Sequence, residues 1–299
     1  MINWIYFAII AQVIWAFCSV IDKVVISKGF IKSPFVYAVL NGAMNVLLIF
    51  LLPFVGFEPL KITDFIIALF AGIAISASVI FYYKAVNYDE ISRIKIMFQI
   101  EPVLTLLFSF LFLGDFLTKG QLAGFLFLIA GGLVVSYKPG NARFSLSNAF
   151  YYILLSLLLS SLYFVSAKYI FSVTSFWSGF LWLRLTSSSA ILVLFAPATR
   201  KDFVETFRII PNKIRGLLGF KMIIDFSAFI FSNLAILYGP IALVTAVNDS
   251  ISPFLVFLIA TFISIYLPKT LKEEISKKAI LTKLSALVFI IIGIIFVIV

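Results

Sequence analysis

Four ionisable residues stand deep inside apolar stretches of this 299-residue sequence, and they are its clearest candidates for chemistry. Glu101, Arg184 and Asp225 lie near the centres of stretches long enough to cross a bilayer, and Asp249 lies somewhat further from such a centre. An ionised side chain at the bilayer centre costs about 2.5–3.5 kcal/mol even on mild insertion scales. We therefore expect these four residues to bind a substrate or an ion, or to form ion pairs.

Glu101 is the strongest of the four. No basic residue lies one helical turn after it, and the nearest one before it is Lys95. Burial disfavours the ionised form of such a carboxyl group, which suits coupling to protons or capture of a cation. The next residue, Pro102, leaves a backbone carbonyl of the helix without its usual donor. We predict a functional role for Glu101.

Two of the other charged residues have a plausible structural reading. Arg184 needs an acid to hold it if it is buried, and Asp225 lies one turn from Lys221 on the same predicted helix. The sequence leaves open whether these side chains form structural ion pairs or contribute to a binding site.

Basic and aromatic side chains supply further candidates. Lys84 and Lys95 flank a turn, where they either reach the membrane surface or line a vestibule that attracts an anionic or zwitterionic substrate. Trp15, Tyr83 and Tyr163 either wall a cavity or pack between helices.

The composition indicates a membrane protein. Hydrophobic residues make up 63% of the sequence and charged residues only 12%, whereas a soluble domain carries roughly 25% charged residues. The sequence has no histidine, and Cys18 is its single cysteine, which removes the usual side chains of metal, haem and catalytic-dyad sites. We therefore expect no cofactor, no metal site and no enzymatic activity.

The net charge of +10 does not indicate a nucleic-acid partner, because the basic residues are spread through short loops between apolar stretches. A membrane surface with anionic lipid headgroups explains this distribution better.

The apolar stretches and the Pro- and Gly-containing breaks between them predict an all-α integral membrane protein with ten transmembrane helices. The predicted helices span residues 2–27, 35–56, 62–87, 91–114, 119–137, 146–170, 175–196, 214–238, 241–267 and 277–299.

The two halves of the sequence resemble each other. The segment from Ala85 to Pro102 has a counterpart from Ala235 to Pro253, in which Ser252 takes the position of Glu101. We predict one five-helix repeat over residues 1–138 and a second over 139–299. Because five is an odd number, the second repeat must be inverted in the membrane, which is the build of many secondary transporters with a central site between the repeats.

One group of motifs is more specific than the repeat itself. It consists of Ala85, Pro102, Leu113-Gly114-Asp115, Thr118, Gly124 and Ala130-Gly131-Gly132. This pattern resembles the repeat signature of the drug/metabolite transporter superfamily, EamA type. The resemblance implies a ten-helix carrier whose central cavity is lined by the first, third and fourth helices of each half, but it implies no particular substrate.

Most of the 23 Lys and Arg residues fall in the odd-numbered connections between predicted helices. Cytoplasmic loops collect positive charge, so we predict that these connections are cytoplasmic and that both termini lie outside. Relatives with ten helices are usually described with both termini inside, so the charge pattern and the resemblance differ here.

The sequence therefore predicts a secondary transporter that moves a small polar metabolite by alternating access. Near the midplane, acids outnumber bases by two to one: Glu101 and Asp225 against Arg184. This balance favours a zwitterion or an organic cation, such as an amino acid or amine, as the solute, and protons as the coupling ion. The alternative is a flippase for a lipid or a lipid-linked sugar. We expect a plasma-membrane protein, monomeric or homodimeric, whose partners are its solute and membrane lipid.

Overall fold

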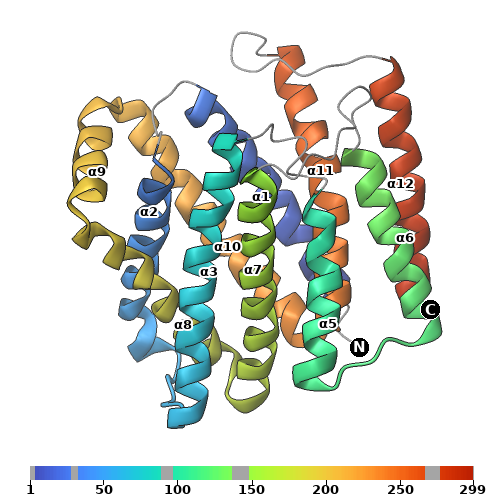
Figure 1. The fold of residues 1–299 in the computed structure, drawn as a ribbon, viewed down its shortest axis with the longest axis horizontal. Helices are drawn as coiled ribbons and strands as arrows, with labels where there is room; N and C mark the ends of the chain where they lie inside the picture. Colours follow the sequence, from blue (N-terminus) through green and yellow to red (C-terminus); the bar gives the residue numbers. More distant parts are fainter. Residues whose placement is uncertain (1–3, 28–32, 89–96, 137–147, 267–276, 299) are drawn as a thin grey trace.

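A computed structural model describes residues 4–27, 33–88, 97–136, 148–266 and 277–298, and all regular elements within them are helices (Figure 1). The long α-helices are α1 (Trp4–Ser27), α2 (Pro34–Leu47), α3 (Ile62–Tyr88), α5 (Glu101–Leu113), α6 (Lys119–Ser136), α7 (Asn148–Val173), α8 (Phe176–Ser187), α9 (Pro197–Ile209), α10 (Asn212–Tyr238), α11 (Ile241–Tyr266) and α12 (Lys277–Ile298). Three 3-10 segments continue or precede them, namely η1 (Leu48–Phe54), η2 (Phe98–Ile100) and η3 (Ser188–Phe195).

Six helical segments within the described residues are long and apolar enough to cross a membrane. They are Trp4–Asp22, Ile62–Ala85, Ala149–Val173, Phe176–Phe195, Asn212–Tyr238 and Ile241–Ile259. Four shorter apolar segments lie at the remaining predicted positions: Ala38–Phe54, Phe98–Leu113, Lys119–Val134 and Leu284–Val297. The all-helical membrane class is thus confirmed, while the count of ten spans and their inversion stay predictions.

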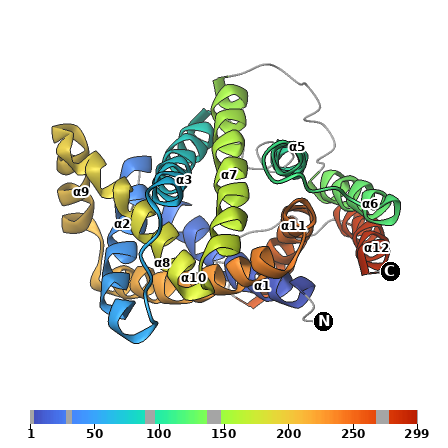
Figure 2. The ribbon, with the colours of Figure 1, turned by 90° about the horizontal axis from the view of Figure 1, so that it is seen from below.

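The helices pack in reciprocal pairs. Helix α1 packs on α10 and α11, whereas α7 packs on α3 and α5. Helix α2 lies against η3, and α6 lies against α12 at one edge of the bundle (Figure 2). Exchanging α1 with α7, α3 with α10, and α5 with α11 leaves this pattern unchanged, as two related repeats would require.

Glycine permits the close contact between α6 and α12. A Cβ atom on Gly124 would lie 2.7 Å from the carbonyl oxygen of Gly293, and one on Gly293 would lie 3.0 Å from that of Gly124. Real side chains do not reach such distances from backbone atoms, so the two helices meet backbone to backbone. Glycine-rich α6 is the late part of the motif group that carried the family resemblance.

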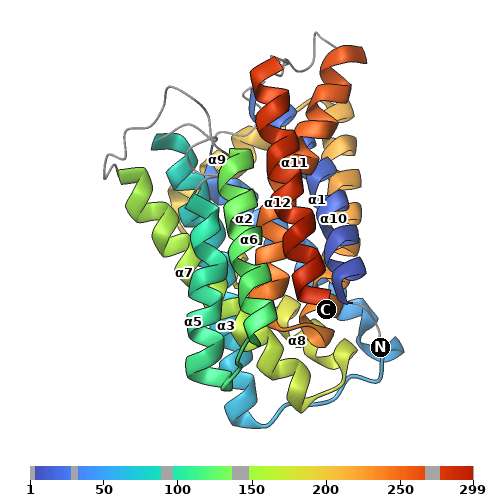
Figure 3. The ribbon, with the colours of Figure 1, turned by 90° about the vertical axis from the view of Figure 1, so that its right-hand side faces the viewer.

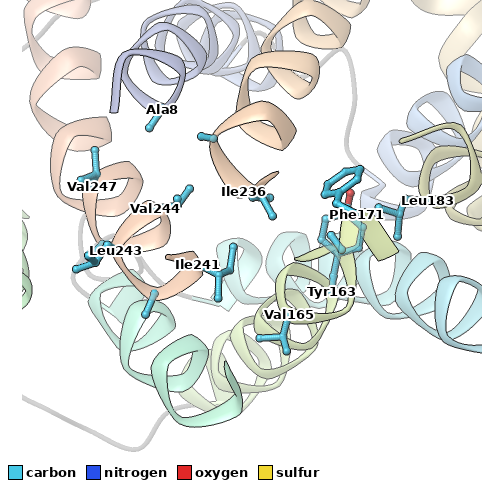
Figure 4. Close-up of a cluster of buried hydrophobic side chains, with 14 of the residues drawn as sticks. Ala8, Tyr163, Val165, Phe171, Leu183, Ile236, Ile241, Leu243, Val244 and Val247 are labelled. Carbon is cyan, nitrogen blue, oxygen red and sulfur yellow. The ribbon is translucent and has the colours of Figure 1, made fainter. Parts of the chain in front are cut away.

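A hydrophobic core joins the helices of the bundle and includes Ile5 near the start of α1 and Val297 near the end of α12. Figure 3 shows that these two chain ends lie at the same end of the bundle. Figure 4 shows how side chains from separate helices meet there, among them Ala8, Phe171, Ile236, Ile241 and Val244, all at most 5% exposed. Removing this much apolar surface from contact with water or lipid, and packing it tightly, holds α1, α7, α10 and α11 together at this end.

Lys168 of α7 reinforces the same end. Its ammonium group donates hydrogen bonds to the carbonyl oxygens of Ile236, Leu237 and Gly239, at 2.9, 2.9 and 3.0 Å. The last carbonyls of a helix lack intrahelical partners, and a cation there also compensates the helix dipole. One side chain thereby caps the C-terminal end of α10.

Two predicted elements differ from the structure. Of the predicted helix 91–114, the structure describes the part from Met97 onward. There a 3-10 turn, η2, precedes α5: the N–H of Glu101 bonds to the carbonyl of Phe98, and the next residue, Pro102, has no N–H to donate. Helix α9 was not predicted, since its sequence is polar and bounded by Pro197 and Pro211.

Candidate functional site

A cavity of about 200 Å³ lies between α1, α5, α7 and α11. Its lining combines three aromatic residues, two acids and four neutral polar residues with Pro253. They are Trp15, Phe98 and Phe164, then Glu101 and Asp249, then Gln12, Thr245, Asn248 and Ser252. No basic residue is among these lining residues of the described chain. The cavity therefore offers negative charge and aromatic faces together.

Glu101 is held at the wall of this cavity by α7. It is 5% exposed and is the first residue of α5. The hydroxyl of Ser160 donates a hydrogen bond to its carboxylate, and the hydroxyl of Ser161 donates one to its backbone carbonyl at 3.3 Å. These contacts orient the carboxyl group, because two neighbouring residues of α7 hold its side chain and its backbone.

Asp249 comes to the cavity from α11. Its backbone carbonyl accepts a hydrogen bond of 3.0 Å from the side-chain amide of Gln99, which is 3% exposed. The amide of Gln99 lies directly against Gly132 of α6, where any side chain would collide with it. Gly132 thus makes room for the link between η2 and α11 that places Asp249 opposite Glu101.

Asp225 lies behind the cavity wall. Its carboxylate accepts a hydrogen bond of 2.9 Å from the indole N–H of Trp15, and Trp15 itself lines the cavity. The same indole makes an edge contact with the ring of Phe229, with centroids 5.2 Å apart. Asp225 therefore acts on the cavity through the orientation of Trp15.

Arg184 is not among the lining residues of the cavity, but it contacts Phe229, the ring that also touches Trp15. It is 7% exposed, and its guanidinium lies 3.7 Å from the centroid of the Phe229 ring. Tyr163 faces both Arg184 and Asn233 without completing a normal hydrogen bond to either one. No ion pair of Arg184 is formed within the described residues, but Asp225 lies close enough to interact with it electrostatically, so the expectation that an acid stabilises Arg184 stays a prediction.

The sequence left open whether Asp225 pairs with Lys221, and the structure gives Lys221 a different ion-pair partner. Lys221 forms its ion pair with Asp22 of α1, at 3.2 Å. Two polar contacts thus join α1 to α10: the ion pair of Asp22 with Lys221 and the hydrogen bond from Trp15 to Asp225. Contacts between helices decide these partners, and spacing along a single helix does not reveal them.

Two other predicted residues, Lys84 and Tyr83, are not among the residues that line the cavity. The ammonium of Lys84 lies 5.7 Å from the ring centroids of Phe35, Phe81 and Tyr152, so cation–π contacts hold it. Tyr83 packs against a small apolar cluster that contains Val25. The prediction for Lys95 falls outside the described residues.

Seven lining residues were not named as site candidates from the sequence: Gln12, Phe98, Phe164, Thr245, Asn248, Ser252 and Pro253. The available signal was weak, because neutral polar residues in apolar stretches often bond to neighbouring helices. Phe98 and Phe164 have no signal at all among 35 phenylalanines.

The arrangement can hold a cation but shows no metal cluster. Within the described residues no group of three His, Cys, Asp or Glu side chains could bind a metal ion. Two carboxyl groups and aromatic faces suit an organic cation, because a carboxylate supplies charge and a ring attracts the cation through its π face.

Comparison with known proteins agrees with this geometry at the level of fold and family. A crystal structure of a protein with 15% sequence identity superposes with a TM-score of 0.68, covering 98% of this chain and 95% of that one, which supports the fold alone. No curated protein matches the sequence. Residues 2–137 match the model of the EamA-like transporter family. Over these residues the chain is therefore similar to membrane transporters of the drug/metabolite transporter superfamily.

Proposed function

We propose that this transporter carries a small organic cation, an amine-bearing metabolite, through the cavity between α1, α5, α7 and α11. The observation that carries the proposal is the presence of two carboxyl groups, Glu101 and Asp249, in one cavity whose described lining holds no base. Trp15, Phe98 and Phe164 add aromatic faces that favour an ammonium group once it leaves water. A zwitterion would bring a carboxylate next to these two acids, so we favour a solute without one.

The size of the cavity supports a small solute over the flippase alternative. Pockets for drug-sized ligands measure about 300–1,000 Å³. At about 200 Å³, this cavity suits a metabolite of a few heavy atoms and not the headgroup of a lipid-linked sugar.

The packing of the helices supports alternating access. Each first helix of a predicted repeat packs on the third and fourth helices of the other, as α1 does on α10 and α11. Rocking one repeat against the other would expose the central cavity to each side of the membrane in turn. We infer that the core around Ile236 and Val244 closes one end and that it must separate when that end opens.

Proton coupling follows from the chemistry of Glu101. A proton and an ammonium group compete for the same carboxylate, so loading of one favours release of the other. Exchange of an amine for protons would drive transport without ATP. We place this activity in the plasma membrane.

Binding is tested first with the purified protein in detergent. Thermal shifts are measured with primary amines, quaternary amines, amino acids and dicarboxylates at equal ionic strength. We expect stabilisation by amines and none by dicarboxylates. The double variant Glu101→Gln, Asp249→Asn should lose the shift, while Asp202→Asn, which removes an exposed carboxylate on α9, should keep it. Stabilisation of wild type by amino acids but not by amines would refute the proposed substrate class.

A further inference from the structure

Helix α9 connects two membrane-spanning segments but is not one itself. The span Phe176–Phe195 ends two residues before Pro197, where α9 begins, and the next span starts at Asn212. The inner side of α9 contributes Phe203 to an apolar cluster that includes Ile210 and Leu218. Helix α9 therefore lies at the edge of the bundle beside α2, with one face against the bundle and the other free (Figure 1).

The free face of α9 carries a groove of about 500 Å³. Residues one turn apart line it, with Arg200, Lys201 and Arg208 as its bases and Glu205 as its single acid. Lys201 is paired with Glu205 at 3.9 Å. Among the described residues no ion pair is formed by Arg200 or Arg208, so two guanidinium groups remain to attract an anion.

The other part of the groove is apolar. Leu194 and Phe195 come from the end of η3, and Val204 from α9. Phe195 is 84% exposed and Val204 is 45% exposed. The apolar segment Phe176–Phe195, long enough to cross a membrane, ends in this part of the groove, so apolar side chains and arginines meet as they do in amphipathic elements at a membrane interface.

We propose that this groove binds an anionic phospholipid. Arg200 and Arg208 hold the phosphate, because guanidinium groups match the oxygens of a phosphate in a bidentate manner. An acyl chain lies along Leu194, Phe195 and Val204. A soluble phosphate compound would explain the arginines but would leave the exposed aromatic ring next to them without a role. The bound lipid fixes α9 against the membrane beside the connection between α8 and α10.

The test uses the full chain in detergent micelles, with binding of phosphatidylglycerol and of phosphatidylcholine of the same acyl chains counted by native mass spectrometry. We expect wild type to retain phosphatidylglycerol at least tenfold better. The variant Arg200→Gln, Arg208→Gln should lose this preference, and the variant Lys61→Gln, Lys119→Gln should keep it, because those lysines are equally exposed but lie outside the groove.

Two further arms separate the alternatives. Glycerol phosphate, a headgroup without acyl chains, should not displace the lipid at equal concentration, and Phe195→Ser should weaken lipid binding while the melting temperature stays near that of wild type. Equal binding by the arginine variant and wild type would overturn the site, and equal displacement by glycerol phosphate would overturn its assignment to a lipid. Amine binding is measured on the same samples, so the outcome is independent of the proposed substrate.

Discussion

The indole N–H of Trp15 donates a hydrogen bond of 2.9 Å to the carboxylate of Asp225, and this contact joins α1 to α10 beside the central cavity. One partner lines the cavity and the other lies behind it. The pair therefore couples the position of a cavity wall to the packing of two helices that belong to different predicted repeats.

Substitution of Trp15 by Phe should test this coupling. The variant keeps an aromatic ring but removes the donor, leaving a partly buried carboxylate oxygen without its partner. We expect a loss of about 1–3 kcal/mol in the free energy of unfolding. Thermal unfolding in detergent measures it, with Trp177→Phe as the control, because Trp177 is 42% exposed. Equal stability of the two variants would show that the bond contributes nothing.

Glu101→Gln should separate binding from coupling. An amide fits the place of the carboxyl group and still accepts the hydrogen bond from Ser160, so the melting temperature should stay near that of wild type. Proton-driven transport should be lost, because an amide cannot exchange a proton. Uptake of an amine into proteoliposomes is measured with and without a pH gradient. Amine binding by wild type should weaken as the pH falls, since protons occupy the carboxyl group, and the variant should lack this dependence. A variant with the pH profile of wild type would contradict the assignment.

Gly124→Ala should destabilise the contact between α6 and α12. Its new methyl group would lie 2.7 Å from the carbonyl oxygen of Gly293, so one helix must move. Overpacking of this kind costs about 1–3 kcal/mol. Gly120→Ala on the same helix is the control, since its methyl group would come no nearer than 3.7 Å to Phe296, an ordinary contact. Helix propensity alone favours alanine in both variants, so a lower melting temperature of Gly124→Ala alone reports the clash, and an equal loss in both would mean that the contact with Gly293 is not responsible.

Lys168→Met should weaken the closed end of the bundle. Methionine preserves most of the side-chain volume but leaves the carbonyls of Ile236, Leu237 and Gly239 without their donor. We expect a loss on the order of 2 kcal/mol. Hydrogen exchange at the start of α11 should rise more than elsewhere, whereas Lys119→Met, at an exposed lysine, should change neither quantity. Unchanged exchange at that junction would argue against the capping role.

Arg184→Met and Lys221→Met should behave differently although both remove a buried cation. Arg184 stacks on Phe229 and has no carboxylate in contact among the described residues, so its loss should change the unfolding free energy by less than about 1 kcal/mol. Loss of Lys221 leaves Asp22 uncompensated and should cost about 3 kcal/mol. Equal losses in the two variants would mean that an acid also holds Arg184.

The class of fold and the two acidic residues of the cavity could be predicted from the sequence for the same physical reason. Apolar stretches of bilayer length stand out against polar breaks, and carboxyl groups such as Glu101 and Asp249 stand out within them. Helix α9 was missed because its polar sequence between two prolines is typical of a loop, and only packing against the bundle makes its helix favourable. Gln12 and Asn248 were missed because neutral polar residues in a membrane helix have many possible roles.

The partners of the charged residues depend on geometry that a sequence does not contain. Lys221 has Asp225 one turn away on its own helix, yet it pairs with Asp22, because α1 presents that carboxylate across the interface. Arg184 lies against the ring of Phe229, a contact that spacing along α8 does not indicate. Which face of each helix meets its neighbour decides both contacts.

The hydrogen bonds of Lys168 have a consequence for how the protein opens. Its three acceptors belong to one helix end, so they cannot be released one after another as α7 separates from α10. The three hydrogen bonds together resist small displacements of α7 from α10. A displacement large enough to break one of them also moves the ammonium group out of line with the other two carbonyls. Opening at this end should therefore be all-or-none, which for a coupled carrier limits leakage of solute or protons through partly open states.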